Sequence, residues 1–238
     1  MRKSLIGILA ASLLLAVSLQ GFAAEPAKDA GAAPDKEAKA ANKDEKPIPP
    51  EKTSVSHGSV EVGGRTIHYT ATAGTVLIRD DKDNKPDASV FYVAYTVDRG
   101  RHDADRPVTF LYNGGPGSSS VWLHMGSVAP VRVESASAGA TAPPPYHLVP
   151  NPNSLIDKTD LVFIDAVGTG FSMPVGKGEG KDFWGVDQDL HAFAKAITRY
   201  VTLNQRWNSP KFLFGESYGT TRSAALVNML QGQGMAFN

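Results

Sequence analysis

The first segment whose hydrophobic pattern predicts regular structure alternates apolar and polar positions. Residues 59–70 alternate on either side of Gly63-Gly64, a pair that accepts the positive φ of a two-residue turn, so they predict a β-hairpin. Residues 74–78 and 89–97, the latter rich in Val, Phe and Tyr, are further strand candidates. Together these segments predict an antiparallel meander.

After residue 107 the pattern changes to short, nearly continuous apolar runs. Such runs are typical of strands buried on both faces of a parallel sheet, and they occupy residues 108–112, 161–164 and 211–214. Residues 183–203 and 217–232 carry apolar side chains at helical spacing. The order strand, helix, strand predicts a right-handed crossover. The proline-rich residues 135–152 predict an irregular excursion.

These elements predict an α/β protein with a mixed, mostly parallel sheet flanked by helices. In a parallel sheet, a further strand is expected after the helical pattern that ends near Gly232. We therefore expect the fold to be incomplete at the carboxyl-terminal side of this sequence.

The amino-terminal residues have the features of an export signal. Arg2 and Lys3 precede an apolar run from Leu5 to Leu19, and small residues follow before a possible cleavage site after Ala23. The run has about fifteen residues, short of the roughly 20 that span a bilayer, so no permanent membrane anchor is expected. We expect a signal peptide at residues 1–23 and an exported protein, periplasmic or extracellular.

Residues 24–54 are rich in Ala, Lys, Glu, Asp and Pro, and contain very few large apolar side chains. Such a stretch cannot bury enough surface to offset its ordering entropy. The sequence therefore predicts a disordered linker at residues 24–54 and a partial catalytic domain at residues 55–238.

Composition narrows the possible chemistry. The chain has 24 Lys and Arg residues against 24 Asp and Glu residues, so it has no surplus of cations to favour nucleic-acid binding. It has no cysteine, which excludes disulfides, thiolate metal sites and a cysteine nucleophile. No metal or organic cofactor is implied by any motif. Catalysis would have to use Ser, Glu, Asp, His or backbone groups.

Residues 215–219, Gly-Glu-Ser-Tyr-Gly, match G-x-S-x-G. They follow the apolar run 211–214 and open a helical pattern, which is the strand-turn-helix setting of a nucleophile elbow. In this setting the Ser217 hydroxyl is exposed above the sheet, and the helix amino terminus favours a developing negative charge nearby. The motif predicts that Ser217 is a nucleophile.

A glycine-rich loop, residues 113–120, follows the strand expected at residues 108–112. Paired glycines allow backbone N–H groups to approach a substrate oxygen, as an oxyanion hole requires. Phosphate binding is the competing use of such a loop, but the expected G-K-[ST] is absent. A tight structural turn remains the simplest alternative.

Three motifs, N-G-G-P-G-S-S, G-T-G-F-S and S-P-K-F-L-F-G-E-S-Y-G, occur in this order, each at the end of a predicted strand. This arrangement resembles the serine carboxypeptidases, exopeptidases with the α/β-hydrolase fold. The resemblance covers residues 108–238 well and residues 55–97 loosely. It implies that the chain is the amino-terminal half of a serine carboxypeptidase that removes C-terminal residues from peptides.

The resemblance assigns roles to residues of both glycine motifs. Ser217 matches the nucleophile, the backbone N–H groups of Gly115 and Tyr218 match the oxyanion hole, and the substrate carboxylate falls at Asn113, Gly114 and Glu216. Glu216 can hold a carboxylate only if the two groups share a proton. Peptide hydrolysis is therefore predicted to prefer acidic pH, whereas ester hydrolysis should tolerate neutral pH.

A base for Ser217 is not evident in this sequence. In α/β-hydrolases the order is Ser, Asp, His, whereas all six histidines precede Ser217. His124, just after the glycine loop, is the one to examine, and Asp165 and Asp187 are expected to be structural. We expect little activity from this sequence alone, because loss of the base removes several orders of magnitude of rate.

Two other functions remain open at this stage. An esterase or acyltransferase would use the same nucleophile and oxyanion hole. A secreted fragment that binds a ligand without turnover would need only the binding groups. For the leading interpretation, the partners are peptide substrates with a free C-terminus.

Overall fold

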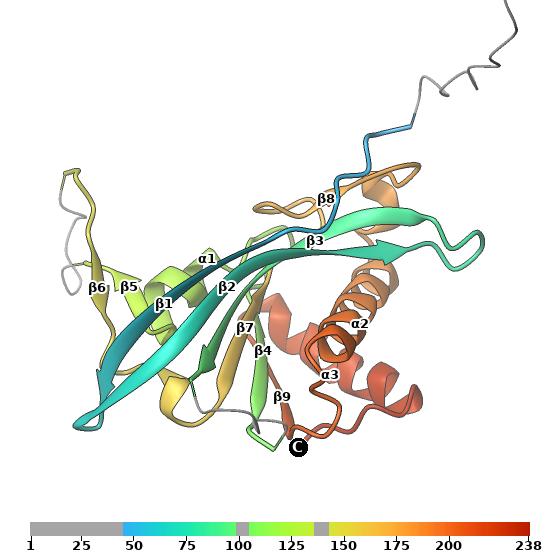
Figure 1. Cartoon of the computed structure of the whole chain (residues 1–238). Helices are drawn as coiled ribbons and strands as arrows, with labels where there is room; N and C mark the ends of the chain where they lie inside the picture. Colours follow the sequence, from blue (N-terminus) through green and yellow to red (C-terminus); the bar gives the residue numbers. More distant parts are fainter. Residues whose placement is uncertain (1–44, 99–104, 136–142) are drawn as a thin grey trace, which may run out of the picture. The chain divides into compact units, whose positions relative to one another are not determined.

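A computed structural model describes residues 45–98, 105–135 and 143–238, and Figure 1 shows the arrangement of the elements. The expected signal peptide at residues 1–23 and residues 24–44 of the expected linker lie outside the described residues. Among the residues that the structure describes, no helix is both long and apolar enough to cross a membrane.

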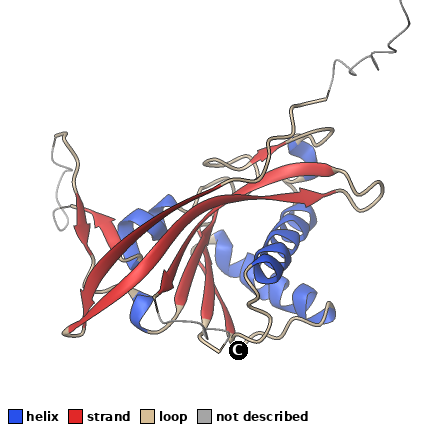
Figure 2. Cartoon of the chain, viewed as in Figure 1, coloured by secondary structure: helices blue, strands red, loops and turns tan. Residues whose placement is uncertain are grey.

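An antiparallel meander forms the amino-terminal part of the sheet, as predicted. It consists of β1 (Thr53–Val62), β2 (Arg65–Arg79) and β3 (Pro86–Val97). Gly63 and Gly64 make the β1–β2 turn with φ of +58° and +73°, values that favour glycine. The long strands are drawn in red in Figure 2.

The strand β2 is longer than the sequence pattern indicated. Residues 65–70 and 74–78 were expected as separate strands, but they form one continuous strand that pairs with β1 and β3. At Gly74, where the pattern is interrupted, the Tyr92 ring lies directly over the backbone. An aromatic side chain that covers a glycine in this way restores the missing packing, which explains why the strand continues.

Three parallel strands follow β3 in the sheet. They are β7 (Asp160–Ile164), β4 (Val108–Tyr112) and β9 (Lys211–Gly215), in the spatial order β3-β7-β4-β9. The short β8 (Met173–Pro174) pairs with β3. The expectation of parallel pairing holds for the strands that carry the glycine motifs, whereas the meander and its junction with β7 are antiparallel.

Helices and irregular segments cover both faces of the central strands. On one face, Phe110 and Tyr112 of β4 pack with the helices α2 (Val186–Leu203) and α3 (Tyr218–Gly232). On the other face, Leu111 packs with Leu123, Ile156 and Phe163. The strands β4 and β7 are thus buried on both faces, as the apolar runs predicted. The strand β9 differs, because Phe212 and Phe214 are 37% and 39% exposed and no described element covers them.

The helix α2 begins later than predicted. Its pattern starts at Phe183, but the helix starts at Val186 because Gly185, with extended backbone angles, stands at the N-cap position. The helix α3 occupies nearly the predicted range, directly after the elbow.

Short elements lie around the central strands. They are α1 (Val121–Leu123), η1 (His124–Val128), β5 (Val131–Val133), β6 (Leu148–Pro150), η2 (Leu155–Asp157) and η3 (Gly180–Asp182). The prediction that residues 135–152 are wholly irregular was wrong at β6, which pairs with β5 in a two-stranded ribbon. Three residues are too few to give a periodic signal in the sequence.

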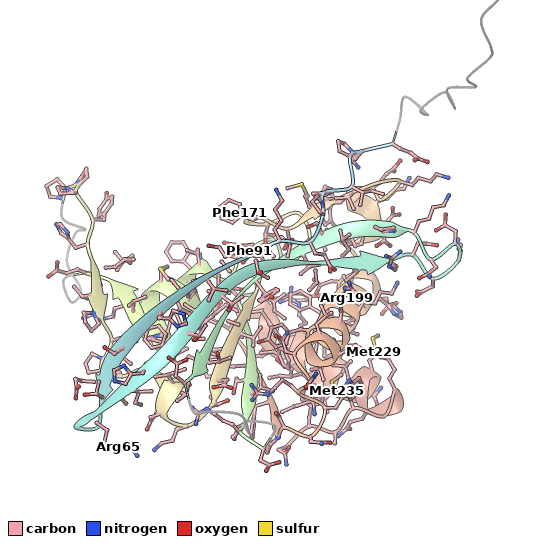
Figure 3. All side chains as sticks on the ribbon, viewed as in Figure 1. Arg65, Phe91, Phe171, Arg199, Met229 and Met235 are labelled. Atoms are coloured by element: carbon pink, nitrogen blue, oxygen red, sulfur yellow. The ribbon has the colours of Figure 1, made fainter. Side chains whose placement is uncertain are left out.

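The expected linker boundary at residue 54 was wrong for its last ten residues. The backbone of Lys46 forms an antiparallel bridge with Gly176. The Glu51 carboxylate accepts from both Nε and Nη2 of Arg199 on α2, at 2.7 and 2.8 Å; Arg199 is labelled in Figure 3. Polar contacts therefore fix this segment to the domain, although its few apolar residues gave no sign of ordering.

A buried charge cluster lies where β4 and β7 begin. The Asp160 carboxylate, in a residue that is 1% exposed, accepts from Arg106 Nε at 2.8 Å and from Arg206 Nη1 at 2.6 Å. It also accepts from the backbone N–H of Val97 at 3.2 Å. The cluster joins the end of β3 and the segment before β4 to β7 and to Arg206, which follows α2.

Candidate functional site

Ser217 stands at a sharp turn between β9 and α3, the setting that its motif predicted. Its backbone has a φ of +57°, a conformation that costs a non-glycine residue roughly 1–3 kcal/mol and persists only where the surroundings enforce it. A side chain at Gly215 would collide with the carbonyl oxygen of Gly219. The tight turn leaves Ser217 exposed at the start of α3.

The glycine loop after β4 lies directly against this turn. The strands β4 and β9 are adjacent and parallel, with Tyr112 opposite Gly215, so the loops that follow them meet at one edge of the sheet. A Cβ atom at Gly114 would lie 2.5 Å from the backbone nitrogen of Tyr218 and 2.7 Å from the carbonyl oxygen of Glu216. The structure thus brings together the two motifs that the sequence separates by about one hundred residues.

Backbone donors remain free at this junction. The N–H groups of Gly114, Gly115 and Tyr218 have no hydrogen-bond partner among the residues that the structure describes. Gly114 is buried, and the first N–H groups of a helix have no partner within the helix. Unpaired donors beside a strained serine are the groups that would stabilise an oxyanion.

Asn113 and Glu216 contact each other beside Ser217. Asn113 Nδ2 donates to Glu216 Oε2 at 3.0 Å, and Asn113 Oδ1 accepts from the backbone N–H of Leu123 at 3.0 Å. Asn113 is buried and Glu216 is exposed. The amide is therefore held in one orientation, with its donor directed at the carboxylate.

Ser217, Asn113, Glu216 and Gly115 border a cavity of about 490 Å³. The indole of Trp122 borders it and is 70% exposed, although no motif pointed to this residue. The cavity is lined by Asn113, Gly115, Ser118, Trp122, Leu123, Glu216 and Ser217.

Asp165 holds the loop that carries the G-T-G-F-S motif, residues 168–172. The Asp165 carboxylate accepts from the backbone N–H of Ser120 at 2.8 Å and from that of Phe171 at 3.4 Å, and burial raises its pKa. It joins the loop after β7 to the loop after β4, which fits the predicted structural role. The Phe171 ring packs edge-on against Phe91, with centroids 5.1 Å apart, as Figure 3 shows for these two labelled residues.

The ion pair between Arg222 and Asp189, which lies next to the site, was not predicted from the sequence. Arg222 on α3 is 1% exposed and binds Asp189 on α2 and the carbonyl oxygen of Asn113. The sequence held one signal, because Arg222 is the single charged residue between positions 217 and 232. A single charged side chain on an otherwise uncharged helix is a candidate for burial in an ion pair.

No described histidine forms a hydrogen bond with Ser217. His57, His68, His147 and His191 are exposed, and His102 lies outside the described residues. Asp187 is exposed in the first turn of α2. The general base therefore remains unassigned among the residues that the structure describes.

His124 belongs to the core rather than to the site. Its Nε2 lies 2.8 Å from the Tyr95 hydroxyl, and its ring stacks on Phe163 with centroids 4.6 Å apart. Burial lowers the pKa of His124 from 6.5 to about 4. The imidazole is thus neutral at neutral pH and packs as a largely apolar ring.

This burial predicts acid sensitivity. Between the unfolded-state pKa of 6.5 and the folded-state pKa of about 4, the unfolded chain binds a proton that the folded chain does not. Stability should therefore fall as the pH falls through this range, by roughly 2–3 kcal/mol between about pH 7 and about pH 4.5. In urea denaturation, His124→Gln should lose less stability than the unmodified chain over this interval. Equal acid sensitivity of the two proteins would contradict the prediction.

The site has no arrangement suited to a metal ion. Within residues 45–98, 105–135 and 143–238, no group of three or more His, Asp or Glu side chains is placed to hold one. The donors around Ser217 are backbone N–H groups, one amide and one carboxylate, a set suited to an anionic or carbonyl-bearing ligand.

Comparison with known proteins agrees with this geometry. The serine carboxypeptidase family matches residues 66–233. The pheromone-processing carboxypeptidase KEX1 of Saccharomyces cerevisiae is 37% identical over 135 residues, which cover 54% of this chain and 17% of that protein. The protein of the same description from Sclerotinia sclerotiorum is 29% identical over 130 residues, or 50% of this chain and 18% of that protein.

A solved structure shows the same fold. The crystal structure of KEX1(Δ)p, a prohormone-processing carboxypeptidase of Saccharomyces cerevisiae, has a TM-score of 0.53 and 26% sequence identity. The match covers 70% of this chain and 35% of that chain, and the chain spans less than a fifth of the curated relatives. With an α/β-hydrolase fold and a family match across most of its length, the chain belongs to the serine carboxypeptidase family.

Proposed function

We propose that this protein is a serine carboxypeptidase that removes C-terminal residues from peptides through an acyl-enzyme at Ser217. The observation that carries the proposal is the approach of Gly114 to the backbone nitrogen of Tyr218. This approach accompanies a cavity that is bordered by the strained Ser217, by Gly115 with its N–H group unpaired among the described residues, and by the Asn113–Glu216 pair.

Each group has a role in this reaction. The Ser217 oxygen attacks the carbonyl carbon of the last peptide bond. The N–H groups of Gly115 and Tyr218 donate hydrogen bonds to the carbonyl oxygen as negative charge develops on it. The terminal amino acid leaves with a proton, and water then hydrolyses the acyl-enzyme. Asn113, Gly114 and Glu216 hold the substrate's terminal carboxylate.

The proton transfers need a base, and this proposal assigns that role to none of the residues that the structure describes. We place this base, a histidine, and its aspartate partner in polypeptide beyond residue 238, in the order that the fold uses. Residues 1–238 alone are then inactive. The complete reading frame would test this placement, since it should contain a later Asp and His.

The same proposal includes export. Residues 1–23 serve as a signal peptide and residues 24–44 as a tether, so the enzyme acts in the periplasm or outside the cell. Amino-terminal sequencing of the secreted protein should start at Ala24, and a start at Met1 would contradict this part.

A pair of substrates separates the proposed activity from its rivals. We expect the complete gene product to release the last residue of a peptide acid and to leave the matching peptide amide intact, because the amide lacks the carboxylate that Asn113 and Glu216 hold. Equal cleavage of both peptides would indicate an enzyme that does not recognise the terminal carboxylate, such as an endopeptidase or the esterase or acyltransferase alternative. Binding of the acid without turnover would indicate a ligand-binding protein.

Acid should favour peptide hydrolysis. Two carboxylates meet beside Ser217 when a peptide binds, and they share the site only if one proton lies between them. The rate with peptides should therefore fall from acidic to neutral pH, while an ester without a free carboxylate is hydrolysed equally well at neutral pH. A peptide rate that still rises above neutral pH would contradict the role of Glu216.

A further inference from the structure

Arg222 lies behind the site and joins the two helices. Its Nε donates to Asp189 Oδ2 at 2.7 Å and its Nη2 donates to Asp189 Oδ1 at 3.2 Å. This two-pronged geometry fixes the plane of the guanidinium group. Because Arg222 is 1% exposed, its charge is balanced inside the protein by Asp189 rather than by water.

The remaining arm of Arg222 reaches the glycine loop. Its Nη1 donates to the carbonyl oxygen of Asn113 at 2.9 Å. The guanidinium carbon also lies 5.1 Å from the centroid of the Tyr218 ring, within the range of a cation–π contact. One side chain thus contacts the residue before Gly114 and the residue after Ser217.

Contact with the Asn113 carbonyl has a geometric consequence. In a planar trans peptide unit, the C=O and N–H groups point in opposite directions. When Arg222 holds the Asn113 oxygen, the N–H of Gly114 must point away from Arg222. This N–H has no partner among the described residues, and it belongs to the loop that borders the cavity of Ser217 and Glu216.

We propose that Arg222, held by Asp189, is a positioning residue that aims the Gly114 N–H at the substrate's terminal carboxylate. The inference rests on the proposed function, because it assumes that a carboxylate binds beside Asn113. Arg222 does not touch the substrate. It fixes the direction of one backbone donor, and the fork to Asp189 prevents the guanidinium from turning away.

A role limited to joining α2 and α3 makes a different prediction. Loss of a purely structural contact would weaken the binding of every ligand alike. Loss of a correctly aimed N–H should weaken only ligands with a carboxylate, by about tenfold or more, as expected for a hydrogen bond to a charged group.

The test compares ligands that differ only in this group. N-acetyl-phenylalanine and N-acetyl-lysine, each paired with its carboxamide, are titrated into the full chain by calorimetry. Binding needs no general base, so the measurement does not depend on turnover. The variants are Arg222→Met, which removes the donor, and Arg222→Lys, which keeps the charge but cannot form both the fork and the third contact.

The chain offers a matched control. Arg199 on α2 also binds a carboxylate through two nitrogens, at 2.7 and 2.8 Å, but its partner is Glu51 in the amino-terminal segment. Arg199→Met therefore removes an arginine–carboxylate pair with the same two-nitrogen geometry, although a more exposed one, without touching the glycine loop. Thermal unfolding of every variant reports any general loss of structure.

The expected result is a preference for the acid over the amide in the unmodified chain and in Arg199→Met. This preference should fall about tenfold in Arg222→Met and by less in Arg222→Lys, with unchanged affinity for the amides. If the Arg222 variants keep the full preference, or lose affinity for acid and amide equally, the inference is overturned and the proposed function stands. If the unmodified chain itself shows no preference, the proposed function fails and the inference fails with it.

Discussion

Replacing Gly114 with alanine is expected to reduce carboxypeptidase activity by a factor of about 100–1,000, the usual effect of losing an oxyanion donor. The new methyl group would lie 2.5 Å from the Tyr218 nitrogen and 2.7 Å from the nitrogen of Gly219. Backbone atoms cannot swing aside as a flexible side chain can. Either the methyl blocks the Tyr218 N–H or the two loops separate, and both outcomes spoil the alignment with Ser217.

The measurement is kcat/KM of the complete gene product with a peptide acid, together with thermal unfolding. Gly126→Ala is the matched control, because a Cβ atom there meets nothing within 4 Å, and its activity should stay near that of the unmodified enzyme. A Gly114→Ala enzyme with normal activity would show that the junction opens freely, which would remove the main support for the proposed function.

Replacing Asp160 with asparagine is expected to lower the free energy of unfolding by about 3–5 kcal/mol, the range for breaking a buried ion pair. Arg106 and Arg206 are 8% and 7% exposed, and both bind this carboxylate. The amide would leave both buried cations without a counter-charge. Its nitrogen would also direct donor hydrogens at a guanidinium group that has only donors.

Urea denaturation of the chain measures this effect. Asp83→Asn provides the comparison, because Asp83 pairs with Lys85 at the surface, with side chains that are 43% and 63% exposed. Such a pair contributes little, so the shift should be below about 1 kcal/mol. Similar shifts for the two variants would mean that the Asp160 cluster is reached by water.

Short-range patterns accounted for much of the fold. The Gly63-Gly64 turn, the apolar strands β4 and β7, and the turn at Ser217 each depend on a few adjacent residues. Parallel pairing of neighbouring strands then forces the loops after β4 and β9 to one edge of the sheet. The meeting of Asn113 with Glu216 could therefore be expected from the sequence, and the resemblance to a family named the same residues.

Contacts between distant polar groups could not be predicted in this way. Arg222 and Asp189 are 33 positions apart, and Glu51 and Arg199 are 148 apart. Each pair lies on separate elements, so neither local spacing nor hydropathy reveals it. The ordered segment around Lys46 was missed for this reason, since its contacts are an ion pair and a backbone bridge rather than buried apolar area.

The exposure of Phe212 and Phe214 was missed for a different reason. An apolar run indicates burial on both faces, but it does not say which element provides the cover. Among the described residues only the strand β4 pairs with β9. Asn238 hydrogen-bonds to Lys211 at the start of the outer edge of β9, but no described strand pairs with that edge.

The positive φ of Ser217 means that folding stability and the proposed chemistry favour different residues at this position. A glycine there would relieve backbone strain and favour folding, while it would delete the hydroxyl that we propose attacks the substrate. Ser217→Gly is therefore expected to unfold at a higher temperature than the unmodified chain, even though it lacks the hydroxyl.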